Sequence, residues 1–117
     1  MHCHGRLRGV LGQIVAMGAD ATDPIEPPPQ GDVTLAEVRR AHGDKLVLFG
    51  NLEIRDVENM PGRAFAAVVQ QALREGTGGA GRGFVLMPSA APYGRTITER
   101  TLENYRTMVR CAEEWRG

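Results

Sequence analysis

The chain has 117 residues, the length of one domain, and its 14 basic side chains balance its 14 acidic side chains. A net charge of zero offers no basic surface to a phosphate backbone, so we expect no nucleic-acid partner. No apolar run approaches the roughly 18 residues of a membrane-spanning helix, so we expect no membrane partner. Two cysteines cannot form a multi-bridge framework, which indicates a reducing, cytoplasmic location.

Predicted helices and strands alternate along the chain. Helices are inferred from apolar residues spaced three and four apart and from capping residues, and strands from short apolar runs bounded by glycine or proline. In chain order the elements are a helix over 6–17, a strand over 19–25, a helix from Thr34 to Gly43, a strand over 45–49, a helix that starts at Pro61 and ends before Gly76, a strand over 83–87 and a helix capped by Thr98.

Three local patterns refine this order. Thr34 and Glu37 form a capping box, and the proline-rich segment 24–31 is predicted to be a loop because proline fixes its own φ and restricts the preceding residue. The glycine-rich segment 76–82 precedes a strand, whereas a nucleotide-binding loop follows one, so we interpret it as a simple connection. In the last helix we expect an inward face, made of Leu102, Tyr105, Val109 and Ala112.

The alternation of helices with short apolar strands is typical of βαβ units on a parallel sheet. Two architectures share this pattern, a small open doubly wound sheet and a stretch of a (β/α)₈ barrel. Only five residues precede the first helix, where a strand end and its loop should lie. This favours residues 1–117 as a section of a (β/α)₈ TIM barrel that begins in the middle of a unit, with about three strands and four helices; the resemblance described below implies that the section is the C-terminal part.

In either architecture, ligands meet the loops that leave the carboxyl ends of the strands. Those predicted loops contain most of the chemically reactive side chains of the sequence. Asn51, directly after Gly50, and Tyr93 are our candidates for substrate binding, although an Asn after Gly is also a common turn former. The catalytic residues are not assigned.

His2 and His4 are the strongest metal-ligand candidates. Because strand side chains alternate, a His-x-His pattern at a strand end places two imidazoles on the same side, with Cys3 on the other. Glu26, held in a proline-rich loop, could complete three protein ligands and leave an open position, as catalytic zinc requires. The alternative is a frayed chain end without a metal.

Several short segments, in this order, resemble the C-terminal part of the uroporphyrinogen decarboxylase superfamily. That superfamily has a (β/α)₈ barrel fold and includes zinc-dependent methyltransferases that move methyl groups between corrinoid proteins and thiols. The resemblance spans essentially the whole chain and about one third of a family member. It is carried by 2–5 (HCHG), 18–20 (GAD), 24–28 (PIEPP), 48–52 (LFGNL), 83–88 and 103–105 (ENY).

The resemblance implies a metal site and a reaction. In the methyltransferases a His-x-Cys-Gly motif binds zinc; here His4 stands in the place of that cysteine, and Glu26 falls where related methionine synthases have a zinc-binding glutamate. A further family cysteine corresponds to the loop that here contains Ser89. The implied function is metal-dependent methyl transfer on a small substrate, with a corrinoid protein as methyl donor.

Two alternatives remain open at this point. One is metal-independent uroporphyrinogen decarboxylation, the other branch of the superfamily, in which the chain would belong to a carboxy-lyase rather than to a methyltransferase. The other is a truncated chain without activity, because its catalytic loops form half of a site. A partial barrel would expose strand edges, so we also expect self-association.

Overall fold

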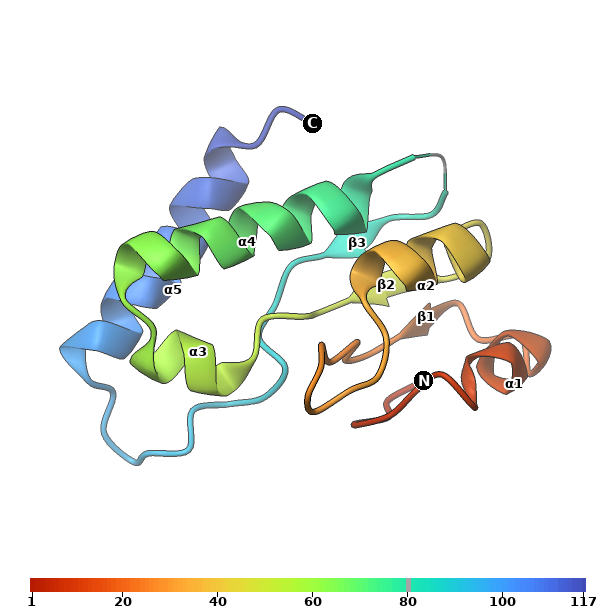
Figure 1. Cartoon of the computed structure of the whole chain (residues 1–117), viewed down its shortest axis with the longest axis horizontal. Helices are drawn as coiled ribbons and strands as arrows, with labels where there is room; N and C mark the ends of the chain where they lie inside the picture. Colours follow the sequence, from red (N-terminus) through yellow and green to blue (C-terminus); the bar gives the residue numbers. More distant parts are fainter. Residues whose placement is uncertain (80) are drawn as a thin grey trace.

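The computed structural model describes residues 1–79 and 81–117, and within them it has three strands and five helices (Figure 1). Strands are short and helices cover much of the chain. The elements are α1 (Leu11–Ala16), β1 (Ala21–Thr22), α2 (Leu35–His42), β2 (Val47–Phe49), α3 (Ile54–Asn59), α4 (Gly62–Thr77), β3 (Phe84–Val85) and α5 (Glu99–Glu114).

The three strands form one parallel sheet in the order β1-β2-β3. Leu48 in β2 pairs with Thr22 in β1 and with Phe84 in β3, which fixes the register across the sheet. Parallel neighbours need crossover connections, and these are α2 between β1 and β2, and α3 with α4 between β2 and β3. The predicted parallel α/β organisation is therefore confirmed for the described residues.

One face of the sheet is covered by helices. Residues paired in register share a face, so Thr22, Leu48 and Phe84 lie together, and Thr22 and Leu48 are fully buried. The Phe84 ring packs against Gly76 of α4, where an added Cβ would lie 2.5 Å from the ring. Glycine at 76 therefore allows α4 to approach β3 closely.

The opposite face of the sheet is less covered. Val47 and Phe49 of β2 are half-buried, and Val85 of β3, which pairs with Phe49, is 38% exposed. Apolar strand residues with this exposure show that the described helices do not pack over this face.

The helices that connect and follow the strands pack against one another. α2 contacts α4, and α4 and α3 both contact α5. The capping box predicted at the start of α2 is confirmed, because the Thr34 side chain accepts from the Glu37 N–H and the Glu37 side chain accepts from the Thr34 N–H. Thr98 likewise caps α5, accepting from the Thr101 N–H.

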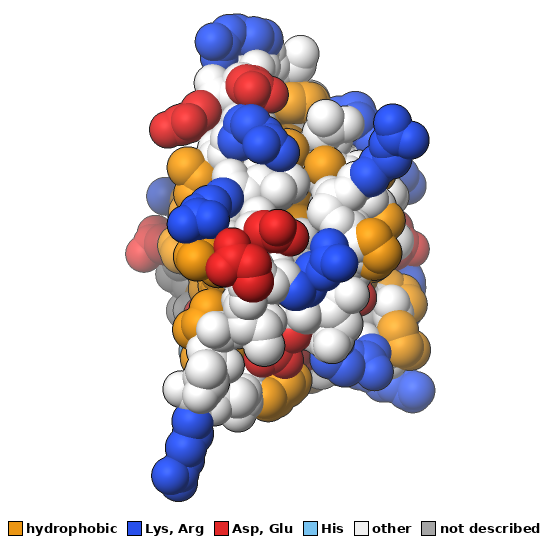
Figure 2. Space-filling model, turned by 90° about the vertical axis from the view of Figure 1, so that its left-hand side faces the viewer, with side chains coloured by type: hydrophobic (Ala, Val, Ile, Leu, Met, Phe, Trp, Pro, Cys, Tyr) orange, Lys and Arg blue, Asp and Glu red, His pale blue; other side chains and the backbone are white. Residues whose placement is uncertain are grey.

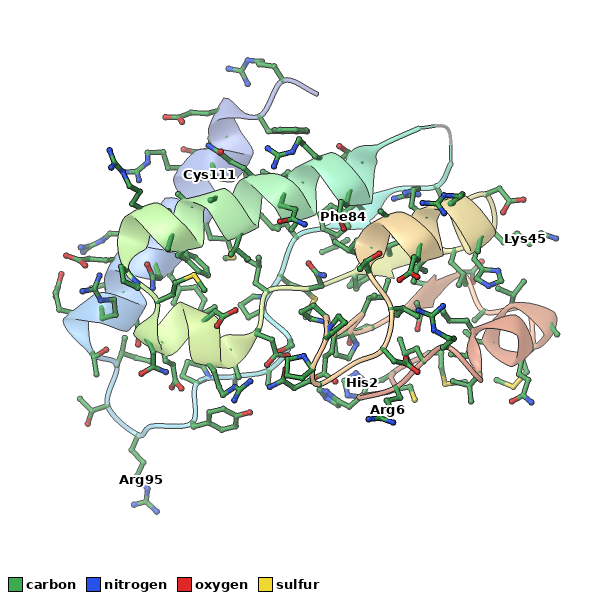
Figure 3. The ribbon with its side chains drawn as sticks, viewed as in Figure 1. His2, Arg6, Lys45, Phe84, Arg95 and Cys111 are labelled. Atoms are coloured by element: carbon green, nitrogen blue, oxygen red, sulfur yellow. The ribbon has the colours of Figure 1, made fainter. Side chains whose placement is uncertain are left out.

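A buried arginine joins the connections at the amino ends of the strands, the end that Lys45 marks in Figure 3. Arg39 of α2 is 9% exposed, and its Nη1 donates to the carbonyls of Arg82 at 2.5 Å and Gly43 at 3.4 Å. Its Nη2 donates to the carbonyls of Gly76 and Gly83. Burial lowers the pKa of this guanidinium. One side chain thus ties α2 to the end of α4 and to the segments before β2 and β3.

A buried asparagine attaches α5 to the α3–α4 turn. Asn104 is fully buried, and its Nδ2 donates to the carbonyls of Met60 at 2.8 Å, Val57 at 3.0 Å and Asp56 at 3.5 Å. The Asp56 carbonyl also accepts from the Met60 N–H at 2.9 Å, whereas the Val57 and Met60 carbonyls lie at the end of α3 and just after it, where helical partners run out. Asn104 therefore supplies hydrogen bonds that the end of α3 lacks.

Some predicted element boundaries were wrong. The helix expected over 6–17 begins only at Leu11, because residues 7–10 form a turn in which the Leu7 carbonyl accepts from the N–H groups of Val10 and Leu11. α3 lies in a segment predicted to be loop; it has six residues and no side-chain cap, so it left no periodic signal. α4 extends through Thr77 into the predicted connection 76–82, of which residue 80 lies outside the described residues.

The predicted inward face of α5 was also largely wrong. Leu102 is 37% and Val109 50% exposed, Ala112 is exposed, and Tyr105 alone of the four packs against the core. The buried residues of the helix are mainly polar, namely Thr101, Asn104, Thr107 and Cys111. Apolar spacing pointed to the wrong face because hydrogen bonds from Asn104 orient the helix.

No described helix is both long enough and apolar enough to cross a bilayer. The face in Figure 2 has basic and acidic side chains intermixed, with apolar ones between them, so no single sign of charge dominates it.

Candidate functional site

The candidate site lies at the carboxyl ends of the strands, as the sequence predicts. Residues 1–3 run beside the end of β1: His2 forms an isolated parallel bridge with Asp23, and the Cys3 N–H donates to the Asp23 carbonyl at 2.8 Å. The loops after β1, β2 and β3 leave from the same edge of the sheet. The strand-like path of residues 1–3 places His2 and His4 against the loop that contains Glu26.

Each of the two histidines contacts a carboxylate. His2 Nδ1 lies 2.8 Å from Asp23 Oδ2, and His4 Nδ1 lies 3.1 Å from Glu26 Oε1. The imidazoles are exposed, whereas the Glu26 side chain is only 11% exposed. A carboxylate at Nδ1 favours the tautomer that donates from Nδ1 and leaves Nε2 as the free ring acceptor.

Glu26 is held on both oxygens. Oε2 accepts from the Gly5 N–H at 2.5 Å while Oε1 contacts His4. Gly5 has φ +85°, a backbone conformation that L side chains rarely adopt. The Gly5 backbone thus turns towards Glu26 and fixes the carboxylate that orients His4.

The two imidazole rings contact each other edge to face, with centroids 4.7 Å apart (Figure 3 labels His2). The structure therefore brings together the three residues predicted as metal ligands, His2, His4 and Glu26. Their arrangement differs from the expected three-ligand site, because Glu26 faces the His4 ring nitrogen. Among residues 1–79 and 81–117, no three His, Cys, Asp or Glu side chains are grouped closely enough to hold a metal ion.

A third carboxylate lies in the loop after β2. Glu53 is 6% exposed, and the buried atom Oε1 has no hydrogen-bond partner among the described residues. Burial raises the pKa of this carboxyl; a hydrogen bond from Ser89 opposes that rise, and the negative charge of Glu26 adds to it. Ser89 itself is buried, and its Oγ also accepts from the Ile54 N–H at 3.2 Å.

The two predicted substrate-binding residues lie apart. Asn51 is half-buried and lines a pocket together with Glu53. Tyr93 is 73% exposed and is not part of that lining; its N–H donates to Glu58 Oε1 at 2.9 Å. Asn51 therefore remains grouped with other polar side chains, whereas Tyr93 faces solvent on the loop after β3.

Glu53, Asp56 and Glu75 line the same pocket. The sequence places Glu53 among the reactive side chains of the strand-end loops, two residues after Asn51, but it does not assign Glu53 a role and does not select Asp56 or Glu75. Asp56 follows Glu53 in the first turn of α3, whereas Glu75 is brought near by the packing of α4 beside this loop.

Comparison with protein-family models, with curated proteins and with solved structures gives no match to this chain.

Proposed function

We propose that His2 and His4 bind a divalent metal, best suited to zinc, at the carboxyl edge of the sheet. The observation that carries the proposal is that each imidazole has its Nδ1 against a carboxylate while the two rings contact each other. Metal-binding histidines usually have this partner at the second ring nitrogen. Both Nε2 atoms are thereby left as the ligand atoms.

In this proposal, Glu26 and Asp23 are positioning residues. Each accepts a hydrogen bond from a ring Nδ1–H, which holds the imidazole in the tautomer whose Nε2 is free to bind a metal. The Gly5 N–H fixes Glu26 in turn. This differs from the sequence-based hypothesis, in which Glu26 was itself a ligand, because both of its oxygens are already engaged.

Imidazoles are ordinary zinc ligands, and His2 and His4 would supply two of the three protein ligands that a catalytic zinc site has. A bound zinc ion would supply Lewis-acid activation of a small nucleophile such as a thiol. The chain's own contribution is to orient the two rings. The reaction class we propose is metal-dependent methyl transfer to a small substrate, in line with the resemblance in sequence, with a corrinoid as methyl donor.

We also infer that the sheet is a section of a (β/α)₈ barrel. Two features support this: sequential parallel strand order, and one sheet face covered by helices while Val47, Phe49 and Val85 are less covered. In a barrel the inner face is filled by strand side chains. We expect the chain to associate through this face as its concentration rises, and light scattering measures the association. A chain that stays monomeric at all concentrations contradicts the inference.

Zinc titration by calorimetry tests the metal proposal. Protein without a histidine tag should bind about one zinc per chain, and His4→Ala should weaken binding about tenfold or more. His42→Ala is the matched control, because His42 lies at the end of α2, away from Glu26 and Asp23. Equal zinc affinity in the wild type, His2→Ala and His4→Ala would contradict the proposal.

The reaction class has its own test. Methylcobalamin and a small thiol are incubated with the chain, and loss of the cobalt-bound methyl group is followed by absorbance. Zinc-dependent demethylation that His4→Ala abolishes is the expected result. Release of carbon dioxide from uroporphyrinogen without metal would instead favour decarboxylation.

A further inference from the structure

The pocket lined by Asn51 and Glu53 lies between the loop after β1, the loop after β2 and α4 (Figure 1 shows these segments). Its volume is about 130 Å³. A single water needs about 10–15 Å³ on such a measure, so this pocket has room for a small organic molecule. Its walls include Thr34, Asn51, Glu53, Asp56, Val68 and Glu75.

The charge of this pocket is one-sided. Glu53, Asp56 and Glu75 contribute carboxyl groups, and no Lys, Arg or His is among the described lining residues. Within residues 1–79 and 81–117, none of the three takes part in an ion pair. A pocket of this composition attracts positive charge and repels anions.

Glu53 differs from the other two carboxyl groups of the pocket because it is buried and one of its oxygens has no partner among the described residues. It is 94% buried, as its exposed fraction is 6%, and its Oε1 has no hydrogen-bond partner among the described residues. A buried polar atom without a partner costs free energy that a suitably placed donor would recover. Burial also raises the pKa of Glu53, the direction expected of a carboxyl with no counterion in ion-pair contact, and the Ser89 hydrogen bond and the Arg55 charge oppose that rise.

The arrangement disfavours a bare metal ion as that counterion. A hard metal ion needs several oxygen ligands free to converge at about 2.0–2.6 Å, and the oxygens of Glu75 are already engaged. Glu75 is turned towards its neighbours: Oε2 accepts from the Ala36 N–H at 3.2 Å and Oε1 from Gln71 at 2.9 Å. Val68 adds an apolar wall, which suits a carbon chain rather than a hydrated ion.

We propose that this pocket binds a small organic cation through a primary ammonium or guanidinium group. The Glu53 carboxyl accepts from an N–H of the cation, Asn51 and Asp56 line the same pocket as further acceptors, and the hydrocarbon part lies along Val68. This site is separate from the histidine pair of the proposed metal site, since neither His2 nor His4 lines it.

The test is a titration of the ¹⁵N-labelled full chain with n-propylammonium and ethylguanidinium chloride at constant ionic strength. Tetramethylammonium, which has no N–H donor, and 1-propanol, which has no charge, are the control ligands. Shifts should concentrate in the backbone amides of residues 51–56 and 68–75. Glu53→Gln, which keeps the size but removes the charge, should weaken binding about tenfold or more.

Glu113→Gln is the matched control variant, because Glu113 is an exposed residue of α5 away from the pocket. Equal affinity of the wild type and Glu53→Gln, or shifts outside the lining, would overturn the proposal. If Mg²⁺ or Mn²⁺ binds through Glu53 and neither n-propylammonium nor ethylguanidinium binds, the proposal that the ligand is an organic cation is wrong. If circular dichroism shows that Glu53→Gln is unfolded, Asp56→Asn replaces it, and an unchanged affinity there counts against the proposal.

Discussion

The two ends of the sheet treat a buried charge in opposite ways. At the amino ends of the strands, both Nη atoms of Arg39 donate to backbone carbonyls, and its buried Nε is the one guanidinium nitrogen without a partner among the described residues. At the carboxyl ends, Glu53 is equally buried, but its Oε1 has no partner among the described residues. A buried charge with most of its donors engaged organises the fold, whereas a buried carboxylate oxygen without a partner costs stability. The amino ends therefore carry a structural cluster, and the carboxyl ends carry the candidate site.

Arg39→Met should show the largest effect of this comparison. Removing the guanidinium leaves four buried carbonyl contacts unmade, so we expect a loss of about 3 kcal/mol in unfolding free energy. Urea denaturation measures it. Arg40→Met, at the exposed neighbour on the same helix, should change stability by no more than about 0.5 kcal/mol. A similar small change for Arg39→Met would refute the structural role of the amino ends.

Asn104→Ala should have the next largest effect. The variant removes three donor contacts from the α3–α4 turn and leaves a small cavity, for a loss of about 2 kcal/mol. The same urea experiment applies, with the exposed neighbour Glu103→Ala as control. A loss confined to α5, with α3 unaffected in hydrogen exchange, would show that Asn104 does not join the two helices.

Glu53→Gln should increase the free energy of unfolding, unlike the two variants above, and the size of the increase should depend on pH. Since burial raises the folded-state pKa above its usual value of 4.5, the folded chain holds the proton longer than the unfolded chain. Wild-type stability therefore falls as pH rises from about 4.5 through the folded-state pKa, while the variant lacks this loss. The charged groups that act on Glu53 are Glu26, Arg55 and Asp56, which are present in both proteins.

Stability curves from pH 4 to pH 8 provide this measurement, and Glu113→Gln provides its control. The variant should gain stability relative to the wild type as pH rises. Parallel curves for the wild type and Glu53→Gln would show that Glu53 is not an unsatisfied buried acid, and would remove the contrast with Arg39.

Local sequence signals predicted the parts of the fold that depend on neighbouring residues. The Thr34–Glu37 capping box and the strand-end placement of His4 near Glu26 required only short-range chemistry and the geometry of parallel strands. The face of α5 could not be predicted, because Asn104 is buried by contacts with Val57 and Met60, more than 40 residues away.

Glu53 is likewise buried by segments that are distant from it in the sequence. Its neighbour Ser89 belongs to the loop after β3, and α4 closes the pocket in front of it. Apolar periodicity carries no information about such polar contacts. The sequence therefore indicates which edge of the sheet holds the reactive side chains, while the structure is needed to tell a paired carboxylate from an unpaired one.

The smallest expected effect concerns the reactivity of the two cysteines, one at the carboxyl edge of the sheet and one on α5. Cys3 is half-buried at the carboxyl edge, whereas Cys111 is 8% exposed on α5, where burial raises the pKa of its thiol. Because the thiolate is the reactive form, iodoacetamide at pH 8 should modify Cys111 at least about tenfold more slowly than Cys3. Mass spectrometry of timed samples gives both rates, Cys111→Ser identifies the slow phase, and urea should equalise the two. Equal rates in the folded protein would mean that α5 opens as readily as the edge that holds His2 and His4.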